Sequence, residues 1–277
     1  MPSLNVVNYI EEAIESVRTQ TLQEIEIICI DAGSNDGTWE ILTKLAAIDE
    51  RIVLRHSNRK SYGYQVNLGI DMAKGEYIAV LETDDYVDSS MYEELYEKAV
   101  LHNCDYVKSD YYAYWTQDNG KRFFVKKKIF LKNELYESVI EPKLYCETAT
   151  EDWYLWTGIY KRKFLRNYNI RLSETPGAAF QDIGFLFQAN IRAKRVLYLK
   201  ERYYRYCLDR DGASTNSGKG LQYSYQEFSR MCEYADKEMN LDCIRMLYCR
   251  MAKSFMCCYE EMENKGAHIT DGERKKY

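Results

Sequence analysis

A short apolar run that ends in three carboxylates constrains this chain more than any other stretch. Residues 75–87 read Gly-Glu-Tyr-Ile-Ala-Val-Leu-Glu-Thr-Asp-Asp-Tyr-Val. The run from Tyr77 to Leu81 follows a glycine and ends at an acidic turn, which is typical of a parallel strand covered on both faces. Carboxylates at the carboxyl end of such a strand lie where open α/β sheets bind ligands. Hard oxygen ligands of this kind suit Mg²⁺ or Mn²⁺ with a phosphate-bearing substrate. The plainer alternative is that the carboxylates form a solvated turn that caps the next helix.

Strands and helices alternate on both sides of this stretch. Helical patterns are expected over residues 8–19, 62–73 and 89–102 and around the apolar positions from Trp39 to Ala46, and short strands over 24–30, 52–54 and 105–109. The alternation predicts an α/β fold, with a mostly parallel sheet flanked by helices. Residues 110–130 are typical of a hairpin that turns at 118–120, and 221–264 of two helices broken near Asn240. We therefore expect one large domain over residues 1–215 and a helical extension over 216–277.

Composition excludes several classes of protein. The chain of 277 residues has a net charge of −5, which argues against general nucleic-acid binding. Its nine cysteines show no framework spacing and no Cys-x-x-Cys pair, so we expect reduced thiols and no zinc site. No apolar run reaches the length of a membrane span, and no signal-peptide pattern is present. We therefore expect a cytoplasmic protein, or one associated with the inner face of the membrane.

Three segments with glycine or acidic residues follow one another along the chain. The first is Pro2-Ser3-Leu4-Asn5 with Asp31-Ala32-Gly33-Ser34-Asn35-Asp36-Gly37, the second Asn67-Leu68-Gly69 with Glu82-Thr83-Asp84-Asp85, and the third Pro176-Gly177-Ala178-Ala179-Phe180-Gln181-Asp182. In this order and spacing they resemble the family 2 glycosyltransferases, which have the Rossmann-like GT-A fold. The resemblance implies an inverting, metal-dependent transferase of hexosyl or N-acetylhexosaminyl groups. It would move a sugar from a nucleotide-diphosphate donor, such as a UDP-sugar, to a saccharide or lipid-linked saccharide acceptor in bacterial surface polysaccharide biosynthesis.

The same resemblance implies roles for individual residues. Asp182 would be the general base that takes the proton of the acceptor hydroxyl. Asp84 and Asp85 would hold Mg²⁺ or Mn²⁺, with Glu82 supporting the metal and the donor. Asp31 would accept a hydrogen bond from the nucleotide base. The other donor contacts would be Pro2, Asn5, Gly33, Lys60 and Asn67, and the candidates for the diphosphate or the acceptor would be Trp156, Arg205 and Arg210.

Plainer roles stay open for several of these residues. From the residues alone, Asp182 could be a helix N-cap and Trp156 could simply pack. Arg205 and Arg210 could be ordinary surface residues. The chemistry nevertheless agrees with the implied roles, because a metal offsets the charge of a leaving diphosphate and a carboxylate activates a hydroxyl.

The chain also departs from the family pattern. The family's apolar first strand has no counterpart before Pro2, so we expect a central strand to be missing and two neighbours to lack a partner. Either the natural start lies upstream or the sheet closes in another way. Ala32 stands where the family has a carboxylate, Glu82 replaces an aspartate, and Val66 replaces an arginine, for which Lys60 or Arg59 could substitute. These changes keep open a second hypothesis, a non-catalytic nucleotide-sugar binder or assembly partner.

Overall fold

A computed structural model describes residues 1–178, 180–209, 220–238 and 240–264. The first part of the chain forms β1 (Pro2–Ser3), α1 (Ile10–Arg18), β2 (Ile27–Asp31), α2 (Thr38–Ala46), β3 (Ile52–His56), α3 (Tyr62–Met72), β4 (Tyr77–Ala79), β5 (Tyr86–Val87) and α4 (Met91–Leu101). The middle forms β6 (Tyr106–Thr116), β7 (Arg122–Lys127), β8 (Val139–Ile140), α5 (Glu147–Thr150), β9 (Gly158–Lys161) and α6 (Arg162–Asn167), with short 3₁₀ turns at Asn133–Leu135, Pro142–Leu144 and Leu155–Thr157. The last part forms α7 (Gln181–Arg192), β10 (Val196–Cys207), α8 (Gly220–Glu238) and α9 (Leu241–Asn264).

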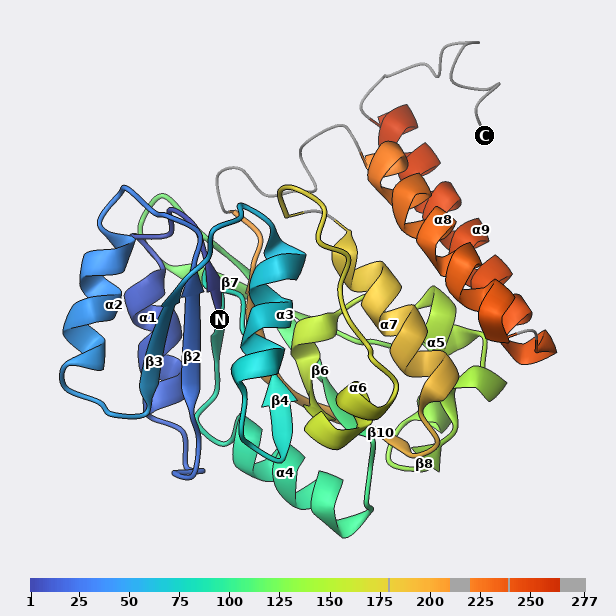
Figure 1. Cartoon of the computed structure of the whole chain (residues 1–277), viewed down its shortest axis with the longest axis horizontal. Helices are drawn as coiled ribbons and strands as arrows, with labels where there is room; N and C mark the ends of the chain where they lie inside the picture. The colour runs from blue at the N-terminus through green and yellow to red at the C-terminus, as the bar shows by residue number, and fades with distance from the viewer. Residues whose placement is uncertain (179, 210–219, 239, 265–277) are drawn as a thin grey trace.

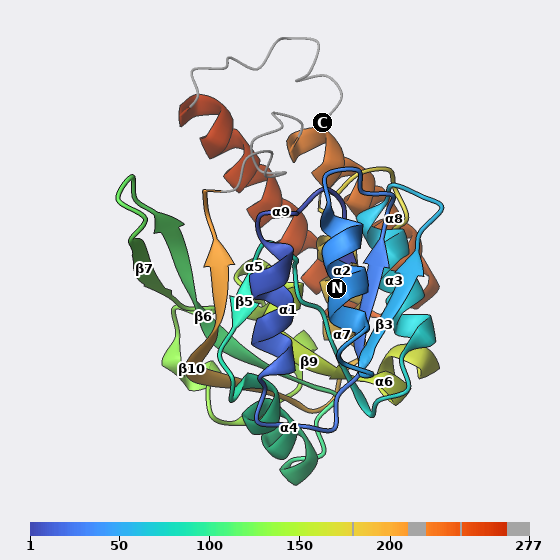
Figure 2. The same ribbon diagram turned by 90° about the vertical axis from the view of Figure 1, so that its left-hand side faces the viewer.

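The strands form two sheets with helices around them (Figures 1 and 2). The smaller sheet is parallel and has the order β1-β2-β3. The larger has the path β4-β9-β6-β10-β5, with β7 beside β6 and β8 beside β10. Within the larger sheet, β6 and β10 run parallel and the other described pairs run antiparallel. The α/β class is as predicted, but the parallel pairing expected after Gly75 is wrong, because β4 pairs with β9, a distant segment that runs in the opposite direction.

Most of the predicted elements are confirmed, with bounds that shift by a few residues. The hairpin of β6 and β7 turns at residues 117–121, and Gly120 takes the positive φ of +79° that such a turn requires. The C-terminal helices break between Glu238 and Leu241. The strand expected over 105–109 is longer than predicted, because the same buried strand continues into the hairpin as far as Thr116.

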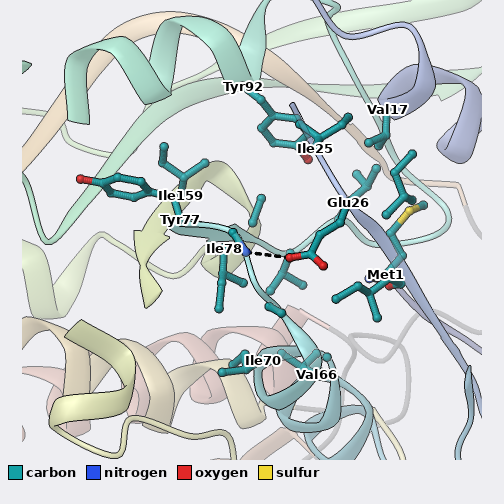
Figure 3. A pocket seen from close by; sticks show the side chains of 18 of the residues that line it. Met1, Val17, Ile25, Glu26, Val66, Ile70, Tyr77, Ile78, Tyr92 and Ile159 are labelled. Atoms are coloured by element: carbon teal, nitrogen blue, oxygen red, sulfur yellow. Dashed lines mark hydrogen bonds between the residues drawn. The ribbon is translucent and has the colours of Figure 1, made fainter. Parts of the chain in front are cut away.

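A cavity of about 510 Å³ separates the two sheets. On the side of the cavity, β2 pairs with β1 over two residues. Among the described strands, β4 pairs with β9 alone. The two strands that were expected to lack a partner therefore correspond to β2 and β4. Figure 3 shows Val66 and Ile70 of α3 with Ile78 of β4 around this space, and a dashed bond to the Glu26 carboxylate. The cavity is largely apolar, and its lining reaches Leu81 but includes none of the three carboxylates of the acidic turn, so we do not assign the chemistry to it.

The C-terminal helices pack on α7 and extend the core. Ile183 and Phe187 of α7 share one apolar cluster with Phe228 of α8 and Met246 of α9. In Figure 1, α8 and α9 lie against each other beside α7. Among the described helices, none combines the length and the apolarity that crossing a membrane requires. The helical pair is therefore attached to the helix on which Asp182 lies.

Candidate active site

The acidic turn after β4 is fixed to two other strands. The Thr83 hydroxyl donates to the carbonyl oxygen of Pro2 at 2.9 Å, which joins the turn to β1. The Asp85 carboxylate is buried, and its two oxygens accept from the backbone N–H of Cys207 at 2.7 Å and the hydroxyl of Tyr204 at 2.8 Å. Asp84 between them is partly exposed. The turn thus directs Asp85 toward β10, where it acts as an anchor, and leaves Asp84 nearer to solvent.

Glu82 connects this turn to the start of α3. Its carboxylate accepts a hydrogen bond from the Tyr62 hydroxyl. Burial, followed by the negative charges of Asp84 and Asp182, raises the pKa of Glu82 to about 7. Asp182 therefore lies close enough to Glu82 for the two carboxylates to repel each other.

Asp31 organises the loop that follows β2. Its carboxylate is fully buried and accepts from the hydroxyls of Ser3 and Ser34, and from the backbone N–H groups of Gly33 and Ser34 at 2.9 Å each. Asn5 extends the network, because its backbone N–H donates to Ser34 Oγ and its side-chain oxygen accepts from the N–H of Asn35. Gly33 has a φ of +82°, which favours glycine. In this structure four donors of the protein engage the Asp31 carboxylate.

One aromatic pair beside this loop was not anticipated. The rings of His56 and Trp39 stack with centroids 3.7 Å apart, and His56 Nδ1 lies 3.9 Å from Asp31. The predicted strand ended at Leu54, two residues too early to place His56 at the strand end beside Asp31. A predicted strand that continued as far as His56 would have placed this residue beside Asp31.

The segment before α7 is docked on the start of α3. The N–H of Gly177 donates to Lys60 O, and the N–H of Tyr62 donates to Gly177 O, each at 2.9 Å. Asn67 is buried and uses both ends of its amide on the backbone of Leu172, at 2.9 and 3.0 Å. Asn67 therefore holds this segment, and the Lys60 side chain stays exposed beside it.

Asp182 lies in the first turn of α7. Phe180, with a φ of +64°, is at the N-cap position, so Asp182 is not the cap that the plainer interpretation allowed. Burial raises the pKa of Asp182 to about 6, while the positive charge of Arg250 and a hydrogen bond from the Ile183 N–H oppose this rise. The carboxylate thus interacts electrostatically with the buried cation Arg250 and with Glu82.

Short links join the elements that carry Asp31, the acidic turn and Asp182. Ser3 bonds to Asp31, and its neighbour Pro2 bonds to Thr83 of the acidic turn. Glu82 of that turn interacts electrostatically with Asp182. Segments far apart in sequence therefore meet at one edge of the fold.

Two of the remaining candidates, Trp156 and Arg205, lie in packed positions. Trp156 is 7% exposed and stacks on both Tyr204 and Tyr206. Arg205 pairs with Asp88 at 2.6 Å and lies over the ring of Tyr112. Arg210 lies outside the described residues.

A buried polar cluster lies behind Asp182 and was missed in the sequence. Lys108 of β6 forms an ion pair with Asp152, whose second oxygen accepts from Tyr198 at 3.0 Å. Arg250 of α9 also reaches Asp152, through its carbonyl oxygen. A lysine within the apolar run of β6 was the available signal.

The acidic turn supplies part of the ligand set of a divalent cation. The described residues contain no cluster of three or more His, Cys, Asp or Glu side chains that could hold an ion by themselves. Asp84 beside Glu82 nevertheless offers hard oxygen ligands whose mutual repulsion raises the pKa of Glu82, after the larger effect of burial. Mg²⁺ typically uses one or two carboxylates, substrate phosphates and waters, so these residues fit a cation that arrives with a diphosphate.

The chain is similar to a described family and to several known proteins. Residues 1–168 match the model for glycosyl transferase family 2. A relative from Bacillus subtilis (strain 168), uncharacterized glycosyltransferase EpsJ, is 32% identical over 207 residues, which make up 74% of this chain and 59% of that protein. This chain therefore spans less than two thirds of that relative's length.

Two solved structures share its fold. S. aureus TarS 1–349, in complex with UDP-GlcNAc, aligns with a TM-score of 0.65 and 19% identity over 83% of this chain and 64% of that one. The mannosyltransferase PcManGT from Pyrobaculum calidifontis, in complex with GDP-Man and Mn²⁺, aligns with a TM-score of 0.62 and 12% identity over 99% of this chain and 76% of that one. These similarities confirm the predicted GT-A fold.

Proposed function

Because the chain belongs to glycosyl transferase family 2, we propose that it moves a sugar from a nucleoside-diphosphate donor to a hydroxyl group of a saccharide acceptor. The observation that carries this proposal is that Asp182, at the start of α7, interacts with Glu82 in the acidic turn. A transferase of this kind needs negative charge where a cation meets the diphosphate and a separate carboxylate that activates the acceptor. The acidic turn would supply the first and Asp182 the second.

The donor is proposed to be a UDP-sugar that lies beside the loop after β2. TarS, which shares the fold, binds UDP-GlcNAc in its structure. Asn5 and Gly33 border this loop, and Asp31 supports the donor indirectly by holding the loop in shape. Lys60 is exposed next to the segment that leads to Asp182, so its ammonium group is the candidate for the diphosphate.

A divalent cation is proposed to bind at Asp84. Asp85 would position the turn instead of binding the metal, since both of its oxygens are engaged on β10. When bound, Mg²⁺ or Mn²⁺ would offset the negative charge that gathers on the diphosphate. Glu82, held by Tyr62, would contact the ribose or the sugar.

Asp182 is proposed to be the general base. It would take the proton of the acceptor hydroxyl as the hydroxyl oxygen bonds to the anomeric carbon. The bond from that carbon to the diphosphate oxygen breaks at the same time, and the nucleoside diphosphate leaves with the electron pair. Attack from the face opposite the leaving group gives inversion. With a pKa raised to about 6, Asp182 is mostly ionised at neutral pH and is a stronger base than an ordinary aspartate.

The acceptor is proposed to lie in a groove beside the loop that leads to Asp182. A cavity of about 620 Å³ lies between Thr175 and Pro176 on one side and α8 on the other. Helix α8 contributes Tyr223, Tyr225, Arg230 and Glu233. Aromatic faces with a few polar groups suit a saccharide, such as the growing end of a surface polysaccharide or its lipid-linked precursor.

Calorimetry with UDP, with and without Mn²⁺, and a transfer assay over a panel of UDP-sugars and acceptors would test this function. We expect metal-dependent UDP binding by the wild type, and D182N should keep that affinity but lose turnover by about 10²-fold or more. The control is D118N, at the exposed hairpin turn, which should transfer at the wild-type rate. UDP binding without transfer by any variant would favour the non-catalytic binder, and normal turnover by D182N would remove the proposed base.

A further inference from the structure

Arg250 is the largest side chain that the described fold buries completely. It lies in α9 and is 0% exposed, although its neighbour Tyr248 is 65% exposed. An arginine keeps its charge under nearly all conditions, and taking that charge out of water is costly unless an anion compensates it. A side chain in this position therefore requires a specific partner.

The contacts of Arg250 leave part of its guanidinium unused. Nη2 donates to the carbonyl oxygen of Asp152 at 2.9 Å, and the guanidinium lies 4.4 Å above the ring centre of Trp153. Nε and Nη1 are buried and have no hydrogen-bond partner in the described structure. Neither contact supplies a negative charge, so the cation is left without a direct anionic partner.

The nearest buried carboxylate already serves another cation. Asp152 forms an ion pair with Lys108 and accepts from Tyr198. Lys108 and Arg250 together carry two positive charges against the one negative charge of Asp152. Ionised Asp182 supplies the second negative charge, and its carboxylate interacts with both cations.

We propose that Arg250 is a positioning residue for Asp182: the buried guanidinium carried by α9 keeps the carboxylate at the start of α7 ionised and directed toward the acceptor. This inference rests on the proposed function, because it concerns the proposed base. It makes the C-terminal helices part of the catalytic apparatus, although they contribute no group that reacts.

The other groups around Asp182 do not replace Arg250. Charged and titratable groups interact with Asp182 from each neighbouring element: Tyr62 of α3, Glu82 of the acidic turn, Lys108 of β6, Tyr154, Tyr160 of β9, Glu227 of α8 and Arg250 of α9. The two glutamates oppose ionisation, and Lys108 is neutralised by Asp152. Among the influences that lower the pKa of Asp182, the positive charge of Arg250 is the largest.

Two neutral variants, R250Q and R250M, test the proposal in the full chain with metal and a UDP-sugar. R250Q keeps a donor for the Asp152 carbonyl and R250M keeps an apolar stem, so a folding failure of one leaves the other usable. We expect the acidic limb of kcat/KM to move to higher pH by about one unit, which is about a fivefold loss at pH 6 that largely recovers at pH 8. R250K, which keeps the charge, should follow the wild-type profile.

Two controls distinguish the loss of this one charge from a general disturbance of α9. R245Q changes an arginine on the same helix that is paired with Asp242, and its profile should match the wild type. An acidic limb that stays in place in R250Q and R250M, or moves as far in R250K, overturns the proposal. Carboxyl ¹³C NMR titration of Asp182, assigned with D182N, measures the same shift without turnover. It therefore decides the role of Arg250 even if no sugar transfer is found and the proposed function fails.

Discussion

The hydroxyl of Thr83, a residue that is 3% exposed, donates to the carbonyl oxygen of Pro2 at 2.9 Å. This single bond ties the acidic turn of the larger sheet to the first strand of the smaller one. It lies between the loop that Asp31 organises and the carboxylate of Asp84. The distance between the loop that Asp31 organises and the acidic turn therefore depends on Thr83, a side chain to which no role in binding or in the reaction is assigned.

Removing that hydroxyl should weaken both the fold and donor binding. In T83V the buried carbonyl of Pro2 loses its donor, so we expect the free energy of unfolding to fall by about 1–3 kcal/mol. UDP affinity should fall with it, because the turn can shift away from the loop. Urea unfolding and calorimetry measure the two effects. T43V removes a similar hydroxyl bond from an exposed position on α2 and should change neither by much. Equal losses in both variants would contradict the assigned link.

The two aspartates of the turn should separate metal binding from stability. D84N should abolish the effect of Mn²⁺ on UDP affinity while leaving the free energy of unfolding within about 0.5 kcal/mol of the wild type. D85N should do the reverse, because its amide nitrogen would face the Cys207 N–H or the Tyr204 hydroxyl; we expect a loss of about 1–3 kcal/mol. Thermal and urea unfolding with and without Mn²⁺ give the comparison. A variant pair with exchanged effects would show that Asp85 is the ligand.

Alanine at each of two glycines of α3 should change the free energy of unfolding in opposite directions. A Cβ at Gly63 would lie 1.9 Å from the carbonyl oxygen of Ser173, whereas at Gly69 its nearest neighbour would be 3.9 Å away. We expect G63A to destabilise the protein by about 3 kcal/mol or more, since backbone must move, and G69A to be neutral or stabilising by up to about 1 kcal/mol through helix propensity. Unfolding by urea measures both. A tolerated G63A would mean that the segment before α7 does not pack as closely as described.

Ionisation of Asp182 should increase activity and decrease the stability of the fold. Because its pKa is raised to about 6, kcat/KM should fall about tenfold per pH unit below that value as the base is protonated. The folded pKa lies above the ordinary value of an unfolded aspartate, so ionisation destabilises the fold. That penalty is absent at pH values below the unfolded pKa and complete above about 6. D182N should therefore be more stable than the wild type by about 1–2 kcal/mol at pH 7.5, but not at pH 4. Urea unfolding at both pH values provides the check, and a less stable D182N at pH 7.5 would contradict it.

Local patterns predicted the helices and the hairpin, because their signals lie within one segment. The apolar spacing in α3 and the turn at Gly120 are examples. The pairing of β4 with β9 could not be predicted in the same way, since a strand's partner depends on contacts between distant segments. Likewise, the short length of β4 and the orientation of Asp85 toward β10 follow from tertiary contacts that no local pattern encodes.

Candidate site residues were named where a resemblance supplied positions, and other groups were missed. The roles of Asp31, Asp84 and Asp182 stay predictions, and the hydrogen bonds that occupy Asp31 appear only when Ser3 and Ser34 are placed beside it. Arg250 belonged to a helix interpreted as packing. Its importance depends on charges from β6 and α7 that fold around it, so only the folded structure reveals it.

Because Trp156 stacks on Tyr204, its fluorescence should respond to ligand binding at the acidic turn. The rings lie 4.3 Å apart, and the Tyr204 hydroxyl touches both Asp85 and the backbone of Glu82. Indole emission is sensitive to its immediate surroundings, so loading the acidic turn should alter the fluorescence of Trp156. A chain whose other tryptophans are replaced by phenylalanine would report occupancy in real time, without any attached dye.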